Sequence, residues 1–228
     1  MEASEKLRGA AEAAAMIQSG WTLMVGGFGL AGCPLTLLDA LAQRDVSDLT
    51  VISNNLGEPG RGLGLLLLQG KIRKAIGSFF TSNPDVGKAY LAGRLEIELL
   101  PQGTMSEAIR AGGAGIPAFY TPTAAGTKLA EGKETREFGG RLCVLERALH
   151  AEAALVRAAR SDRLGNLVYR TSGRNFNPMM ATAADLVIAE VDEIVPAGAL
   201  SAEEIVTQHL FVDMLVLSSQ PRRGDGRG

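Results

Sequence analysis

The stretch Leu23–Leu41, LMVGGFGLAGCPLTLLDAL, joins an apolar run, a cluster of glycines and a run of leucines that follows a proline. The apolar run is typical of a buried β-strand. Pro34 suits the first turn of a helix, where a backbone N–H has no partner in the helix. Leu35, Leu38 and Leu41 then recur at helical spacing. A strand, a glycine turn and a helix in this order predict the first unit of a parallel α/β sheet.

The rest of the chain continues this alternation. The predicted strands are residues 21–25, 49–53, 72–80, 95–100, 142–146, 153–159, 166–170 and 186–195. Thr104 and Glu107 have the spacing of a capping box, which predicts a helix over residues 105–112. Pro178 is expected to begin a further helix over residues 179–185. The alternation favours a parallel sheet that is covered by helices.

Residues 111–141 differ from the rest in character. They are rich in glycine and carry a charged run, so we predict a long, mostly irregular segment that serves as a functional loop or an intersubunit contact. No linker divides the chain, and we expect one domain over residues 1–217. The polar ending at residues 218–228 is predicted to be a flexible tail.

Composition and charge bound the class of protein. The chain has 228 residues, and its 23 basic and 25 acidic side chains give a net charge of −2. This balance predicts no nucleic-acid partner and no polybasic membrane anchor. No apolar run approaches the roughly 20 residues of a membrane span. Cys33 and Cys143 lie far apart, so neither a disulfide framework nor a metal site is indicated, and we expect reduced thiols in a cytoplasmic protein.

Small or amide-bearing residues follow three predicted strands. They are Gly26–Phe28, Ser53–Asn55 and Pro101–Gly103. In open parallel sheets, ligands bind at the carboxyl ends of the strands. Glycines let a ligand approach the main chain, and a helix that follows aims N–H groups at an anion. Asn54, Asn55 and Gln102 offer neutral groups that can orient or polarise a carbonyl. The sequence therefore predicts a small-molecule site at this edge.

A nicotinamide cofactor is one possible occupant. Gly27, Gly29 and Gly32 match the G-x-G-x-x-G pattern of dinucleotide-binding folds. That fold also needs an acidic residue at the end of the second strand, where it holds the ribose hydroxyls. Here the second strand ends in Ser53–Asn55. We therefore interpret the glycines as part of a different site.

Several blocks of the chain resemble the family I CoA-transferases, and they occur in the family's order. They are GGFGLAGCP (26–34), SNN (53–55), GLGLLL (62–67), LLPQGTMSEAIRAGGAGIPAFYTPT (99–123), GTKLAEGKETREFGGR (126–141), GNLVYR (165–170) and RNFNPMMATAA (174–184). The resemblance runs from Ile17 to Val216 and is to the alpha subunit of the 3-oxoacid CoA-transferases. Ser19 departs from the family, which has an acid or Asn there. Residues 56–64 lack the acidic run common in members that use succinyl-CoA, which leaves the acyl donor open.

The resemblance implies a fold and a mechanism. The fold is three layers, α/β/α, around a mainly parallel sheet, as in ribose-5-phosphate isomerases. CoA would move from an acyl-CoA such as succinyl-CoA to a 3-oxoacid such as acetoacetate by ping-pong chemistry, through a glutamyl-CoA thioester. The nucleophilic Glu of the family lies in a Ser-Glu-Asn-Gly motif of a separate beta subunit, and this sequence lacks that motif. The resemblance implies an α₂β₂ assembly, CoA as substrate rather than as a permanent cofactor, and no metal.

The resemblance also assigns roles to residues of this chain. Gln102 would stabilise the oxyanion that forms as the Glu attacks the thioester. Asn54 and Asn55 would lie close to the reacting carboxylate. The CoA-associated loop would consist of Gly26, Gly27, Phe28, Gly29, Leu30, Ala31 and Gly32.

Other functions stay open at this point. Within the family, 3-oxoadipate or acetate/butyrate–acetoacetate CoA-transferases are alternatives. A metabolite sensor on the same scaffold usually carries a DNA-binding appendage, for which the chain has no spare segment. A sugar-phosphate isomerase needs its own pair of catalytic carboxylates, and none is recognisable. Glu58 is expected to be a solvated loop acid. Cys33 lies at a predicted helix start, which can lower a thiol pKa, and we assign it no chemistry.

Overall fold

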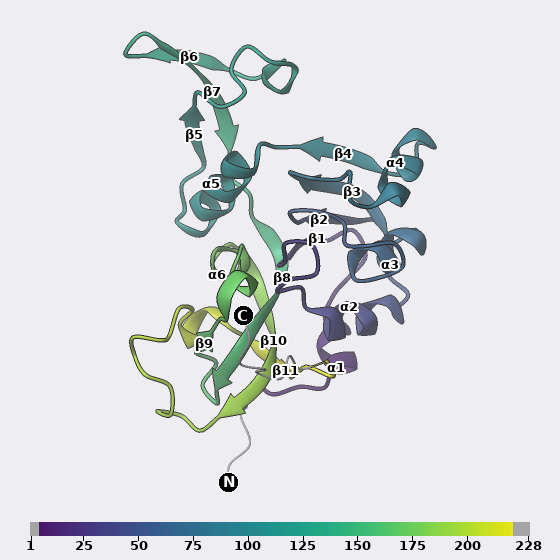
Figure 1. Ribbon diagram of the computed structural model, residues 1–228, viewed down its shortest axis with the longest axis vertical. Helices are drawn as coiled ribbons and strands as arrows, with labels where there is room; N and C mark the ends of the chain where they lie inside the picture. Colours follow the sequence, from purple (N-terminus) through teal and green to yellow (C-terminus); the bar gives the residue numbers. More distant parts are fainter. Residues whose placement is uncertain (1–4, 221–228) are drawn as a thin grey trace.

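The computed structural model describes residues 5–220 and contains a large parallel sheet beside a small antiparallel one (Figure 1). The strands of the large sheet are β1 (Thr22–Val25), β2 (Leu49–Ile52), β3 (Ile72–Gly77), β4 (Glu96–Leu99), β8 (Ala151–Asp162), β9 (Leu167–Val168), β10 (Ala184–Val195) and β11 (Met214–Leu217). Their order is β11-β10-β8-β1-β2-β3-β4, all parallel, and the short β9 pairs antiparallel with β8. The predicted parallel α/β sheet is confirmed.

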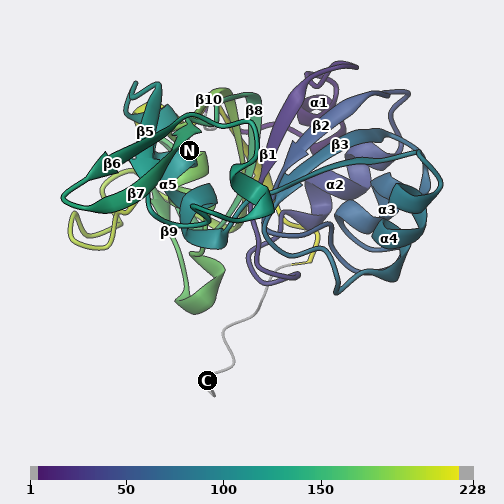
Figure 2. The same ribbon diagram turned by 90° about the horizontal axis from the view of Figure 1, so that it is seen from above.

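Helices cover both faces of this sheet. They are α1 (Ala10–Ala14), α2 (Leu35–Ala42), α3 (Leu63–Leu68), α4 (Pro84–Leu91), α5 (Gln102–Gly113) and α6 (Asn177–Met180). Figure 2 shows α2, α3 and α4 together on one side of the sheet, and α5 apart from them. Helix α6 packs against α5, β8 and β1. The arrangement has the three layers that the resemblance implies.

Strand β1 supplies side chains to both layers of core. Leu23 and Val25 pack in the core shared with α1 to α4, whereas Met24 packs with Met105 and Met180 of α5 and α6. Successive side chains of a strand point to opposite faces, so a strand buried on both faces is apolar throughout. Each fully buried side chain of this size contributes about 1.5–3 kcal/mol. This is why the opening apolar run predicts the centre of the sheet.

The strand order reverses direction between β1 and β8. From β1 the chain proceeds outward through β2, β3 and β4, and it returns later to place β8, β10 and β11 on the other side of β1. Such a switch point leaves a crevice at the carboxyl ends of the two central strands. The glycines after β1 lie at that crevice.

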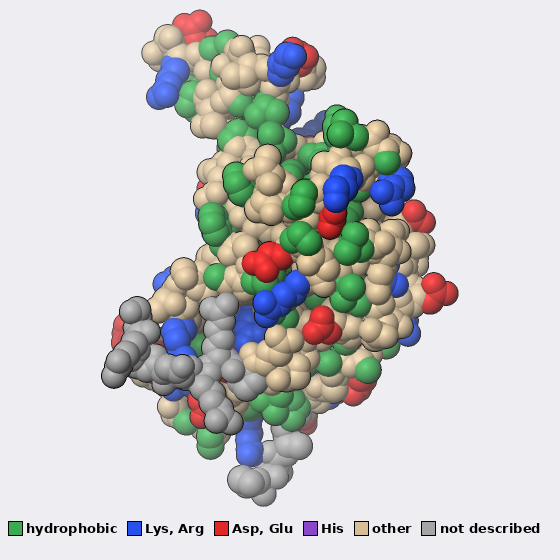
Figure 3. All heavy atoms as spheres, turned by 45° about the vertical axis from the view of Figure 1, so that its right-hand side comes forward, with side chains coloured by type: hydrophobic (Ala, Val, Ile, Leu, Met, Phe, Trp, Pro, Cys, Tyr) green, Lys and Arg blue, Asp and Glu red, His purple; other side chains and the backbone are tan. Residues whose placement is uncertain are grey.

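The segment predicted to be irregular contains regular structure. β5 (Ala118–Thr121), β6 (Thr135–Phe138) and β7 (Arg141–Arg147) form a three-stranded antiparallel sheet. This sheet projects from the main body (Figures 1 and 3). The prediction of a mostly irregular segment missed the strands β5 and β6, and β6 is exposed along its whole length, so it has no alternation of apolar residues to recognise. The tilted rings of Tyr120 and Phe138, with centroids 5.1 Å apart, join β5 to β6.

The predicted capping box is also wrong. Helix α5 begins at Gln102, so Thr104 lies inside its first turn rather than ahead of it. The Thr104 hydroxyl is buried, with no hydrogen-bond partner among residues 5–220. Glu107 instead pairs with Arg110, at 2.6 Å between Oε1 and Nη2. Pro101 occupies the position before the helix and moves its start upstream of the predicted one.

Other boundaries differ from the predictions. The strand expected over residues 72–80 ends at Gly77, and the strand expected over residues 166–170 shortens to two residues. Pro178 does lie in the first turn of a helix, but α6 ends at Met180, because β10 already begins at Ala184. No helix among residues 5–220 is long and apolar enough to cross a membrane.

The first three residues of the predicted tail contact the sheet and α2. Ser218 Oγ donates to Glu190 Oε1 at 2.7 Å, the N–H of Ser219 donates to Thr36 Oγ1 at 3.0 Å, and the carbonyl of Gln220 accepts from Arg157 Nη2 at 3.1 Å. Residues 221–228 of the predicted tail lie outside the described residues.

Candidate functional site

The glycine loop, residues 26–32, forms a tight turn at the carboxyl end of β1. The N–H of Phe28 donates to the carbonyl of Ala31 at 3.0 Å, and the N–H of Ala31 donates back to Phe28 at 3.1 Å. Gly27, Gly29 and Gly32 have φ angles of 132°, 61° and 69°. These values lie in the left-handed region, which favours glycine. The turn leaves the Phe28 side chain about half exposed.

The N-terminus of α2 is occupied by a carboxylate of this chain. Glu190 of β10 is completely buried, and its Oε2 accepts from the N–H of Leu37 at 3.2 Å. Its Oε1 accepts from Thr36 Oγ1 at 2.9 Å. A dinucleotide phosphate would need these helical donors. The anion expected at this turn is therefore the Glu190 side chain, which gives a second reason against a nicotinamide site.

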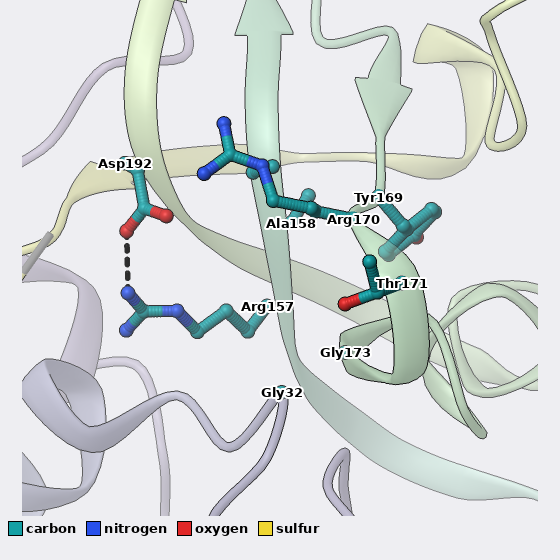
Figure 4. A pocket seen from close by; sticks show the side chains of 9 residues that line it. Gly32, Arg157, Ala158, Tyr169, Arg170, Thr171, Gly173 and Asp192 are labelled. Carbon is teal, nitrogen blue, oxygen red and sulfur yellow. Dashed lines mark hydrogen bonds and ion pairs between the residues drawn. The ribbon is translucent and has the colours of Figure 1, made fainter. Parts of the chain in front are cut away.

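Arg157 of β8 neutralises this buried carboxylate. Its Nη1 donates to Glu190 Oε1 at 2.5 Å, and its Nη2 donates to Asp192. Figure 4 shows the Arg157 and Asp192 side chains directed at one another beside Gly32. They line a cavity of about 60 Å³ that Tyr169, Arg170, Thr171 and Gly173 close on the other side. The buried ion pair and its hydrogen bonds thus connect β8, β10 and α2.

A chain of side-chain amides joins the end of β2 to the start of α5. Asn55 Oδ1 accepts from the N–H of Gly57 at 2.9 Å, and Asn55 Nδ2 donates to Asn54 Oδ1 at 3.1 Å. Asn54 Nδ2 donates to Gln102 Oε1 at 3.4 Å and to Ser78 Oγ at 2.8 Å. Asn54 and Asn55 are buried, whereas Gln102 is exposed.

The donors and acceptors in this chain of hydrogen bonds all run in the same order, from Gly57 to Gln102. Each amide accepts with its oxygen and donates with its nitrogen, so the last oxygen, Gln102 Oε1, points back toward Asn54. The Gln102 Nε2 group makes no hydrogen bond within the described part of the chain. The geometry thus offers a neutral donor to a ligand, held in orientation by two buried amides.

One cavity of about 350 Å³ brings the glycine loop and Gln102 together. Its lining is Phe28, Gln102, Gly103, Ser106, Asn175, Phe176 and Met179. No charged side chain is in this lining. The predicted residues Phe28 and Gln102 therefore share one cavity, with Asn54 and Asn55 buried behind Gln102.

The remaining loop residues lie elsewhere. Leu30 and Gly32 border another cavity, with Arg61 and Glu58, and Gly26 and Gly27 are buried. Sequence reasoning on strand ends missed Ser106, Asn175, Phe176 and Met179, because none of them follows a strand of the sheet. The signal that points to three of them is the RNFNPMM block, residues 174–180.

Comparison with known proteins shows where the chain belongs. Residues 8–218 match the family model described as coenzyme A transferase. The chain belongs to the coenzyme A transferase family. It is one of the two kinds of subunit in such an enzyme, the alpha subunit, and the resemblance read from its motifs is confirmed.

Individual CoA-transferases match most of the chain. The corresponding subunit of a succinyl-CoA:3-ketoacid coenzyme A transferase from Xanthomonas campestris is 53% identical over 92% of this chain and 87% of its own length. The corresponding subunit of a 3-oxoadipate CoA-transferase from Pseudomonas putida is 49% identical, over 89% of each chain. The crystal structure of an acyl-CoA transferase from Escherichia coli O157:H7 has a TM-score of 0.85 at 20% identity. It matches 96% of this chain, which spans 48% of that structure's chain.

Cys33 of this CoA-transferase chain has an unreactive environment. The side chain is 4% exposed, and burial, reinforced by the nearby Glu190 carboxylate, raises the pKa of its thiol to about 12. The pKa of this thiol is therefore raised rather than lowered, although α2 begins two residues later, at Leu35. Within residues 5–220, no group of three or more His, Cys, Asp or Glu side chains could hold a metal ion.

Proposed function

We propose that this chain is the alpha subunit of a 3-oxoacid CoA-transferase, which moves CoA between an acyl-CoA such as succinyl-CoA and a 3-oxoacid such as acetoacetate. The observation that carries the proposal is the amide chain that ends at Gln102, in the cavity that Gln102 shares with Phe28. Relatives named for succinyl-CoA:3-ketoacid transfer support the substrate class.

The geometry suits the attack of a carboxylate on a thioester. The attack places negative charge on the thioester oxygen, and a donor already held in position stabilises that charge without reorganising. Gln102 Nε2 is such a donor, because Asn54 fixes the orientation of its amide. Asn54 and Asn55 support Gln102 from behind and lie next to the place where we expect the reacting carboxylate.

The nucleophile comes from outside this chain. The sequence has no Ser-Glu-Asn-Gly motif, and we assign the Glu that forms the glutamyl-CoA thioester to a partner beta subunit. A covalent intermediate preserves the free energy of the thioester until the acceptor acid arrives. The glycine loop, residues 26–32, would lie against CoA and help to exclude water. We propose an α₂β₂ assembly in the cytoplasm, with residues 1–217 of this chain as one domain.

The test is reconstitution with the beta subunit. Succinyl-CoA and acetoacetate are given to this chain, to a beta subunit that carries Ser-Glu-Asn-Gly, and to their mixture, and acetoacetyl-CoA is measured. We expect activity only in the mixture. The intermediate, trapped with hydroxylamine and located by mass spectrometry, is expected on the beta subunit. Thioester exchange by this chain alone, with the trapped label on one of its own glutamates, contradicts the proposal.

A second candidate is the alpha subunit of a 3-oxoadipate CoA-transferase. The 49% identity to the relative of that name favours it nearly as strongly as the first. Acetate/butyrate–acetoacetate transfer is the third alternative, supported by a relative named acetate CoA-transferase subunit alpha. The same reconstituted enzyme, assayed with each acid in turn, separates the three by kcat/KM.

A further inference from the structure

We propose that Asn177 is a positioning residue of the transfer reaction, because its hydrogen bonds hold the glycine loop in the shape that brings Phe28 into the cavity lined by Gln102. The inference goes beyond the proposed function by assigning a role to a residue outside the strand ends, and it rests on that function for the chemistry of the loop. Asn177 opens α6 and is completely buried. It does not line the cavity of Phe28 and Gln102. An effect of Asn177 on the reaction is therefore indirect, and hydrogen exchange of the glycine loop distinguishes a path through the loop from one through residues 175, 176 and 179, which line the cavity.

Both the nitrogen and the oxygen of the Asn177 side-chain amide form hydrogen bonds. Its Nδ2 donates to the carbonyl of Gly32 at 3.0 Å and to the carbonyl of Gly173 at 2.9 Å. Its Oδ1 accepts from the N–H of Arg157 in β8 at 2.9 Å. The Asn177 side chain thus connects Gly32, at the end of the glycine loop, to β8, the strand on the other side of the switch point.

The backbone of the loop fits around this side chain. A Cβ atom added at Gly26 would lie 1.8 Å from Asn177 Oδ1. A Cβ atom added at Gly32 would lie 2.3 Å from the carbonyl oxygen of Gly173 and 2.7 Å from Asn175 Nδ2. Glycine at both ends of the loop is therefore what lets residues 173–177 approach. The two segments interlock, and a change in one displaces the other.

Asn175 holds the middle of the loop in the same way. Its Oδ1 accepts from the N–H of Gly27 at 3.1 Å, and its Nδ2 donates to the carbonyl of Ala31 at 3.0 Å. Asn175 has a φ of 21° and Thr171 a φ of 47°, both in the left-handed region. Such a conformation costs about 1–3 kcal/mol and persists only where surrounding contacts hold it. Asn175 also lines the cavity, so the kinetics of an Asn175 variant could not distinguish a lost positioning role from a lost contact with the ligand. Asn177 is the cleaner test.

The first experiment replaces Asn177 with Asp and with Ala in the complex with the beta subunit. Asp has nearly the same shape, but it directs an oxygen instead of a donor at the carbonyls of Gly32 and Gly173. We expect faster hydrogen exchange in a peptide covering residues 23–35. We also expect a fall in kcat/KM for acyl-CoA of up to about 100-fold, as for a misplaced group far from the reacting atoms.

The control is Asn166→Ala. Asn166 is also buried, and it donates to Asp162 Oδ2 at 2.7 Å and accepts from the N–H of His209 at 2.9 Å, away from the glycine loop. All variants are assayed at a temperature where each complex is folded. Asn166→Ala is expected to lose stability while keeping wild-type kcat/KM and wild-type exchange in residues 23–35. Equal kinetic losses in Asn166→Ala and Asn177→Ala would overturn the proposal, because the effect would then be general.

A second experiment tests the interlock without any assay of activity. Gly26→Ala, Asn177→Ala and the double variant are unfolded in urea. The Ala side chain at position 177 removes the atoms that a Cβ at Gly26 would meet. We expect the double variant to unfold at a higher urea concentration than the sum of the two single shifts predicts. A shift in the double variant equal to the sum of the two single shifts in urea midpoint would show that the two residues do not interact.

The results distinguish a failure of the Asn177 positioning role from a failure of the proposed CoA-transferase function. An inactive wild-type complex contradicts the proposed function, while exchange and the double-variant cycle still decide the interlock. An active wild-type complex in which Asn177→Asp keeps full kcat/KM overturns the positioning role alone. Faster loop exchange together with reduced kcat/KM, in an active enzyme, supports it.

Discussion

The side chains of Asn54 and Gln102 are joined by a 3.4 Å hydrogen bond from Nδ2 to Oε1, although 48 positions separate them in the chain. Asn54 is itself held by Ser78 and by Asn55, so it cannot turn without breaking two further contacts. Gln102 therefore keeps its oxygen toward the protein and its amino group toward the cavity. For a reaction that develops negative charge, this orientation is the productive one.

Gln102→Glu should reduce kcat sharply. The substitution keeps the shape of the side chain but removes the donor and places an acceptor in the cavity. Loss of one oxyanion donor costs on the order of 10²–10³ in kcat. Gln102 is exposed, so the urea midpoint should hardly change. Steady-state kinetics of the complex with the beta subunit checks this, with the exposed Gln43→Glu as the matched control. Wild-type kcat in Gln102→Glu would contradict the assigned role.

Two glycines of the same loop should tolerate alanine differently. Gly29 and Gly32 both have left-handed φ angles, so alanine at either position costs about 1–2 kcal/mol of backbone strain. A Cβ atom at Gly29 meets nothing within 4 Å, whereas one at Gly32 meets the carbonyl of Gly173. Gly32→Ala should therefore lower the free energy of unfolding by more than Gly29→Ala does, as urea unfolding will measure. Equal losses in the free energy of unfolding would contradict this prediction, because they would mean that residues 173–177 move aside to accommodate the new methyl group.

Glu190→Gln should destabilise the fold strongly. The substitution leaves the buried Arg157 guanidinium with Asp192 as its remaining charged partner and weakens the contact with the start of α2. Breaking a buried ion pair by removing one partner costs about 3–5 kcal/mol when the other charge is left uncompensated, so with Asp192 still paired to Arg157 we expect a loss toward the lower end of that range. Glu193 is exposed on the same strand, so Glu193→Gln is the control, with an expected change within about 0.5 kcal/mol. Similar urea midpoints for the two variants would contradict the role given to Glu190.

Stability should fall at alkaline pH because of Cys33. Its thiol has a pKa of about 12 in the folded protein against 9.0 for an unperturbed thiol. Below the lower value both states keep the proton. Between the two values the unfolded state loses the proton first, so unfolding becomes more favourable as pH rises.

The measurement compares wild type with Cys33→Ala. Between about pH 8 and about pH 10, the free energy of unfolding of wild type should fall by about 1.4 kcal/mol more than that of the variant. The native thiol should also resist iodoacetamide near neutral pH, because the thiolate is the reactive form. Parallel stability curves for the two proteins, or rapid alkylation of native Cys33, would show that the thiol is not held protonated.

Much of the candidate site follows from position in the chain alone. Phe28, Asn54 and Gln102 each come directly after a strand, or at the start of the helix that follows one. The carboxyl ends of parallel strands meet at one edge of a sheet. The direction of the amide chain could not be predicted, since it depends on where Ser78 places its acceptor oxygen and where Gly57 places its donor N–H. Asn177 lies in the RNFNPMM block, but its positioning role could not be predicted, because it depends on contacts with Gly32 and Arg157 that form only when the chain has packed.

The parallel α/β fold and the glycine loop are predictable from the order of the residues, because both depend on local requirements. A strand buried on two faces must be apolar throughout, and a left-handed φ favours glycine. Two features emerge only when the chain has folded. Glu190, 153 positions from Leu37, is the anion at the start of α2, and residues 173–177 hold the loop. Such contacts depend on distances and hydrogen-bond directions that exist only once distant segments have packed together.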